Sequence, residues 1–88
     1  MTDTVGPVLD AGDAGRAIVA AIRATNAAVE VHDRGAYLRV LVPHRCVLRR
    51  EAVERELGRG FTLPGDLELV MPSFKGTMTM TADEVMWT

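Results

Sequence analysis

The sequence is poor in cysteine, since Cys46 is the one cysteine in 88 residues. A single thiol cannot form an intramolecular disulfide, so the chain lacks the covalent framework of many small secreted domains. Residues 1–4 are polar and carry neither the basic stretch nor the apolar stretch of a secretion signal. Both features are typical of a reducing compartment, and we expect a cytoplasmic protein.

Long apolar runs and aromatic residues are also scarce. The apolar runs are only a few residues long, far short of the roughly 20 residues that span a bilayer. Aromatic residues make up 5% of the chain, and the formal net charge is −2. We therefore expect no membrane partner, and we expect no nucleic acid partner because there is no bulk positive charge to attract one.

The remaining composition is that of one small folded domain. Hydrophobic residues make up 48% of the chain and charged residues 25%, which is typical of globular proteins. Size scaling predicts a folded surface of roughly 5,000 Å² against roughly 14,000 Å² for the unfolded chain. That allows a modest core and no deep cleft. We expect residues 1–4 to be flexible and residues 5–88 to form one domain that binds through its outer faces.

Periodicity predicts a strand and then a helix at the start of the chain. Val5–Leu9 is typical of an extended segment, with Pro7 at a strand start or sheet edge because proline lacks an N–H. Asp13 is the expected N-cap of a helix that continues to about Thr25, and Asn26 is expected to close that helix.

The next segment predicts an antiparallel hairpin. Residues 29–32 and 36–42 alternate as strands do, around a turn at residues 33–35. One face of the second strand carries Leu38, Val40 and Val42, and the other face carries Tyr37, Arg39 and Leu41. Pro43 is expected to break this strand before Cys46–Leu48 resumes it.

The second half predicts a helix followed by short strands. The helix is expected over Arg50–Leu57, with Glu51 and Arg55 as an outward ion pair and Gly58 just past its end. Strands are expected over residues 67–71, 77–81 and 84–87, with a turn at residues 72–76. The predicted fold class is α+β: a compact single domain of two small, mostly antiparallel β-sheets with two main helices.

The residues with catalytic or metal-binding chemistry are few. His44 and Cys46, with His32 and Asp33 upstream, could be drawn as a metal site, but they lack the paired ligand spacing of zinc sites. Cys46 and His44 could also be drawn as a nucleophile and its base, although nothing supplies an oxyanion hole. The competing interpretation is an exposed loop histidine and a buried structural thiol. We expect no metal, no cofactor and no catalytic residue.

Basic residues are concentrated in the middle of the chain. Seven of the ten lie between Arg34 and Arg59, namely Arg34, Arg39, Arg45, Arg49, Arg50, Arg55 and Arg59. A solvated helix face, a protein-docking patch and a nucleic-acid patch are the alternatives.

Methionines crowd the last third of the chain, at Met71, Met78, Met80 and Met86. They fit either core filling on one sheet face or an adaptable binding surface.

Several short motifs occur together in a fixed order. They are Val5-Gly6-Pro7 with an acidic turn before a helix, the strand Arg34–Val40, the basic helix ending Glu54–Phe61, Leu67-Glu68-Leu69, and Pro72–Gly76. In this order and spacing, from about Val5 to Trp87, the chain resembles the effector, or coupling, proteins of soluble bacterial diiron monooxygenases. In length it is most similar to the branch that serves toluene and alkene monooxygenases.

The resemblance implies a cofactor-free, non-catalytic subunit, and we expect the subunit to be monomeric when free. Such proteins bind the diiron hydroxylase over its metal centre and tune oxygen activation, substrate access and the coupling of electron use to hydrocarbon oxidation, including that of aromatic hydrocarbons. The residues that we expect to contact the hydroxylase are Arg34, Tyr37, Arg39, Phe74, Lys75 and Gly76. The alternatives are a small nucleic-acid-binding domain that uses the Arg34–Arg59 region and a small enzyme that uses Cys46 and His44.

Overall fold

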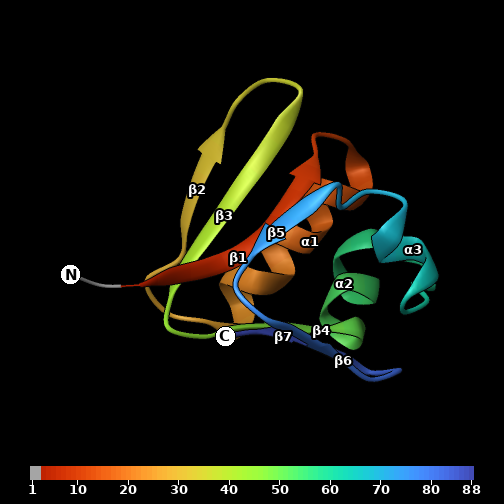
Figure 1. Ribbon diagram of the computed structural model, residues 1–88. Helices are drawn as coiled ribbons and strands as arrows, with labels where there is room; N and C mark the ends of the chain where they lie inside the picture. The colour runs from red at the N-terminus through yellow and green to blue at the C-terminus, as the bar shows by residue number, and fades with distance from the viewer. Residues whose placement is uncertain (1–2) are drawn as a thin grey trace.

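The computed structural model describes residues 3–88, which form two antiparallel sheets and three helices (Figure 1). The elements in chain order are β1 (Thr4–Asp10), α1 (Asp13–Thr25), β2 (Glu30–Asp33), β3 (Tyr37–Pro43), β4 (Cys46–Arg49), α2 (Arg50–Leu57), α3 (Gly65–Glu68), β5 (Ser73–Lys75), β6 (Met78–Met80) and β7 (Glu84–Trp87). The larger sheet has the order β2-β3-β1-β5 and the smaller sheet β4-β7-β6. The predicted α+β class with two main helices is confirmed. Within residues 3–88 no helix is long and apolar enough to cross a membrane.

The N-terminal segment enters the larger sheet almost at once. Residues 1–2, part of the segment expected to be flexible, lie outside the described residues. The carbonyl of Asp3 accepts a hydrogen bond from the backbone N–H of His44 at 2.8 Å, and Thr4 begins β1.

Strand β1 lies inside the larger sheet, so the prediction that Pro7 marks a sheet edge is wrong. β1 pairs with β3 on one side and with β5 on the other. The register between β1 and β3 has no partners at Gly6 and Pro7, so the proline lies where that ladder is interrupted. Gly6 allows this local geometry, because its φ is +148° and a Cβ there would lie 2.4 Å from the carbonyl oxygen of Val40.

Helix α1 supplies the central layer of the core. Its N-cap is Gly12 and not Asp13, which instead lies in the first turn, where the helix dipole favours a carboxylate. The helix buries Ile18 and Ile22 completely. One continuous apolar cluster joins these side chains to residues of both sheets, including Leu9 and Trp87. Met71, Met78 and Met80 pack against the same cluster, in agreement with the core-filling interpretation of these methionines.

The side chain of Asn26 ties the end of α1 to the smaller sheet. Its backbone N–H and its Nδ2 both donate to the carbonyl of Ile22, which closes the helix as predicted. Its Nδ2 also donates to the carbonyl of Val47 at 2.7 Å, and the N–H of Val47 donates to its Oδ1 at 2.9 Å. The amide thus pairs with the edge strand β4 much as a neighbouring strand would.

Helix α2 matches its predicted bounds, but its ion pairs differ from the prediction. The Gly58 cap adopts the left-handed conformation as expected, with φ of 72°. No ion pair joins Glu51 and Arg55 among the described residues; instead Arg50 pairs with Glu54 at 2.7 Å. Arg50 also reaches Asp83 at 3.1 Å, since Asp83 lies at the turn before β7, which pairs with β4.

Three predictions along the second half are wrong. β4 does not resume β3: His44 takes a positive φ of 64°, and the chain passes into the second sheet. The predicted strand at residues 67–71 is instead the turn of α3 and the residues after it, with Leu67 buried. The predicted turn at residues 72–76 contains strand β5, because Ser73–Lys75 pairs with β1.

Cys46 is an inert core residue. Its side chain is fully buried in the apolar cluster. Burial raises the pKa of the Cys46 thiol to about 12, so the thiol stays protonated at neutral pH. Only the deprotonated thiolate acts as a nucleophile or binds a metal, and burial disfavours that form here.

We predict that Cys46 in the native protein resists Ellman's reagent at pH 8 and reacts fully in denaturant. The thiol is both inaccessible and protonated in the folded state. The reaction is followed by absorbance against free cysteine as the control. Immediate stoichiometric reaction of the folded protein would show that the thiol is exposed.

We predict that Asn26→Ala lowers the free energy of unfolding by about 2–4 kcal/mol, because it leaves both polar groups of the Val47 backbone without partners. The matched control is Thr25→Ala at an exposed residue, which removes one part-buried side-chain hydrogen bond to the carbonyl of Ala21 and should change stability by about 0.5 kcal/mol or less. Urea unfolding measures both variants, and equal stability losses would contradict the role of Asn26.

Candidate functional site

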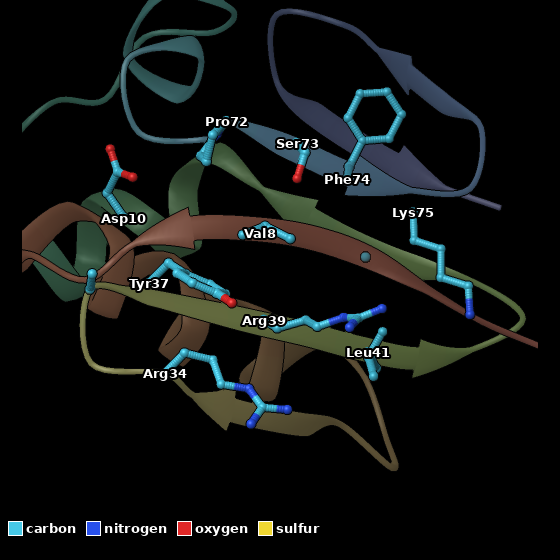
Figure 2. A pocket seen from close by; sticks show the side chains of 12 residues that line it. Val8, Asp10, Arg34, Tyr37, Arg39, Leu41, Pro72, Ser73, Phe74 and Lys75 are labelled. Carbon is cyan, nitrogen blue, oxygen red and sulfur yellow. The ribbon is translucent and has the colours of Figure 1, made fainter.

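The larger sheet has one covered face and one open face. The inward-facing residues of β1 and β3 join the apolar cluster that contains α1, while the opposite face carries an open hollow of about 730 Å³. We call this face the outer sheet face. Its hollow is lined by Gly6, Val8, Asp10, Arg34, Ala36, Tyr37, Arg39, Leu41, Pro72, Ser73, Phe74 and Lys75 (Figure 2).

The outward direction of these side chains follows from strand alternation. Leu9 and Leu38 are paired and buried, so the pairs on either side of them point outward: Asp10 with Tyr37, and Val8 with Arg39. The exposed fraction of Tyr37 is 42%, which is high for a large aromatic residue. The face therefore offers an aromatic side chain and apolar residues beside charged groups.

Three cations lie around the hollow, at Arg34, Arg39 and Lys75. The nearest polar contact of Lys75 is to the hydroxyl of Thr4, at 3.3 Å. Within the described part of the chain, none of the three forms an ion pair. In Figure 2 their charged ends extend toward the end of the hollow where Leu41 lies, whereas Asp10 lies at the other end.

Phe74 and Gly76 differ from the other predicted contact residues. Phe74 lies on the edge strand β5 and not at a loop tip, because β1 recruits this segment into the sheet. It faces the buried Pro7, and in Figure 2 its ring points away from Tyr37 and Arg39, although 41% of it remains exposed. Gly76 lies outside the hollow, where a Cβ would come within 2.8 Å of Val5.

The structure thus gathers five of the six predicted residues and adds others. Arg34, Tyr37, Arg39 and Lys75 line the hollow, and so does Phe74, although its ring points away from Tyr37 and Arg39. The sequence analysis missed Val8, Asp10 and Ser73 as parts of the same face. Alternation along Val5–Leu9 signals that Val8 points outward, but Ser73 could be found only by knowing that β5 pairs with β1.

The other candidate sites do not assemble. His44 is exposed on a loop while Cys46 is buried and protonated, so the pair cannot act as nucleophile and base. His32 instead contacts Glu30, with Nε2 and Oε2 2.6 Å apart. Within residues 3–88 no group of three or more His, Cys, Asp or Glu side chains could hold a metal ion.

The basic residues between Arg34 and Arg59 do not form one surface. Arg34 and Arg39 line the hollow of the larger sheet, while Arg49 ends β4 in the smaller sheet and pairs with Glu84. Arg50 is neutralised by Glu54 and Asp83. A continuous basic track for a phosphate backbone is therefore not present among these residues.

Comparisons with known proteins agree on one family. Residues 3–88 match the model of the MmoB/DmpM family. The chain is 42% identical over 85 residues to the effector subunit of the alkene monooxygenase system of Xanthobacter autotrophicus (strain ATCC BAA-1158 / Py2). The aligned region covers 94% of this chain and 83% of that protein.

A solved structure shares the fold. It is a chain of a phenol hydroxylase–regulatory protein complex, with a TM-score of 0.83 and 23% identity over 96% of this chain and 94% of that one. The full-length family match and the 42% identity show that this chain belongs to the MmoB/DmpM family, and that it is a non-catalytic effector subunit of a multicomponent monooxygenase.

Proposed function

We propose that this effector subunit binds the diiron hydroxylase of its monooxygenase through the outer sheet face. The observation that carries the proposal is that this face is uncovered, concave, and lined by Tyr37 with the cations Arg39 and Lys75. Tyrosine and arginine are the residues most enriched in the energetic centres of protein interfaces. A non-catalytic subunit acts by contact with its partner, and the outer sheet face is well suited to make that contact.

The size of the molecule is compatible with such a contact. A standard interface buries about 800 Å² on each partner, which is roughly a sixth of the 4930 Å² accessible surface of this protein. A contact of that size can form on the outside of the folded domain without unfolding any element. We therefore expect the fold to dock largely as a rigid body.

The solved structure with the same fold supports this partner. That structure is a complex of phenol hydroxylase with its regulatory protein. By analogy, the partner of this chain is the hydroxylase of its own system, at near one-to-one stoichiometry with the active site. The relatives are named for an alkene and a phenol, so the proposed system oxidises a hydrocarbon or a phenol.

The proposed mechanism is selective binding. An effector changes a catalyst only by binding one of its conformations more tightly than another. A tenfold preference corresponds to about 1.4 kcal/mol, which one or two contacts from Tyr37 or Arg39 can supply. The subunit would thereby change substrate access, oxygen activation and the coupling of electron use to product while its own residues take no chemical part.

Two substitutions test the face directly. Tyr37→Ala and Arg39→Glu should each weaken binding to the cognate hydroxylase by about tenfold or more, because they remove or reverse central contacts. Both side chains are exposed, so the thermal midpoint should change little. The control is Arg55→Glu, an exposed arginine on α2. Titration calorimetry gives affinity, and product formed per electron pair gives coupling. If Arg55→Glu lost affinity for the hydroxylase while Tyr37→Ala and Arg39→Glu kept it, the proposed face would be refuted.

A third substitution tests the edge of the same face. Phe74→Ala should weaken hydroxylase binding less than Tyr37→Ala does, because its ring points away from the hollow. It should also lower the free energy of unfolding by about 1–2 kcal/mol, since more than half of the ring is covered. Leu69→Ala is the matched control, because Leu69 is 78% exposed on another surface. If Phe74→Ala weakened binding more than Tyr37→Ala, the centre of the interface would have to move to β5.

A further inference from the structure

The outer sheet face carries an unbalanced charge. Three cations and one carboxylate, Asp10, line its hollow, a formal charge of +2 from three minus one. The whole chain carries −2, so the rest of the molecule carries −4. Such a separation of charge orients a protein as it approaches a charged partner. The effector therefore presents a positive hollow on an otherwise acidic molecule.

The cations also lie toward the same end of the hollow. In Figure 2 the charged ends of Arg39 and Lys75 lie near Leu41, at the end away from Asp10, and the side chain of Arg34 extends in the same direction. None of them forms an ion pair among residues 3–88. Like charges held together repel, and water and salt compensate for this only while the face is exposed.

A second acidic side chain on this side of the sheet is already engaged. Glu30 of β2 is the register partner of Leu41, so it points to the same face. Its carboxylate contacts Nε2 of His32 at 2.6 Å. His32 is in turn the register partner of Arg39 and lies on the same face. Among residues 3–88, the carboxylate that lines the hollow is that of Asp10, at the end away from Leu41.

We propose that an acidic segment of the hydroxylase, with carboxylates placed to meet Arg39 and Lys75, occupies this hollow. This inference rests on the proposed function and specifies the chemistry of the partner surface. Burial of cations in an interface is costly unless opposite charges accompany them, and arginine pairs with carboxylates through two parallel hydrogen bonds. Val8 and Leu41 line the same hollow, so the segment also carries an apolar side chain.

A nucleic acid is a less suitable occupant. The remaining arginines of the central region lie on other elements, and Arg49 and Arg50 are engaged by carboxylates. The hollow has Tyr37, whereas the ring of Phe74 points away from Tyr37 and Arg39, so the described residues offer no row of aromatic rings on which bases could stack. A net negative chain also repels phosphates at long range.

The experiment measures the dissociation constant for the cognate hydroxylase between about 50 and 300 mM NaCl, a range over which the screening length falls more than twofold. Wild-type affinity should fall by about tenfold or more over this range. The double variant Arg39→Gln/Lys75→Gln should bind about tenfold more weakly at low salt and lose most of the salt dependence. Arg55→Gln is the control and should behave as wild type.

The outcomes are distinguishable. Saturable wild-type binding that does not respond to salt would overturn the acidic partner and leave the proposed function standing. The same salt dependence in the double variant as in wild type would also overturn it. Failure of wild type to bind at any salt concentration would overturn both proposals. Duplex DNA is the competing probe, and tight DNA binding that the double variant loses would assign the hollow to phosphates instead.

Discussion

The fold depends on the connection between α1 and the smaller sheet at Asn26. Its side-chain amide holds both polar groups of the Val47 backbone while it closes the helix. The two sheets then share one apolar core, which covers the inner face of the larger sheet. Because the core takes up only that face, the opposite face stays open, and the exposure of Tyr37 and Arg39 is a consequence of this arrangement (Figure 1).

Local pattern predicted the parts of the fold that depend on neighbours in sequence. The bounds of α2 and the inward and outward faces of β3 follow from their periods of 3.6 and 2. The exceptions depend on distant residues. Ser73–Lys75 looks like a turn because proline precedes it and glycine follows it, yet pairing with β1 makes it a strand. Pro7 lies in an interior strand because the ladder to β3 is interrupted there.

The candidate site likewise combines features that depend on neighbours in sequence with features that depend on distant residues. Arg34, Tyr37, Arg39 and Lys75 could be named from the sequence through family resemblance and strand alternation, and the structure brings them to one face. The hollow itself could not be predicted, because it requires β1 between β3 and β5. The direction of Phe74 depends on the same pairing. Cys46 is protonated because burial raises its pKa to about 12.

The most direct test of the docking face is a cross-saturation NMR experiment on the methyl-labelled effector mixed with the unlabelled cognate hydroxylase. Saturation passes only to methyl groups that lie against the partner. The account predicts loss of signal at Val8 and Leu41 of the outer sheet face, with little change at Leu69, whose exposed side chain lies on another surface. Saturation of Leu69 with Val8 and Leu41 unaffected would contradict the account.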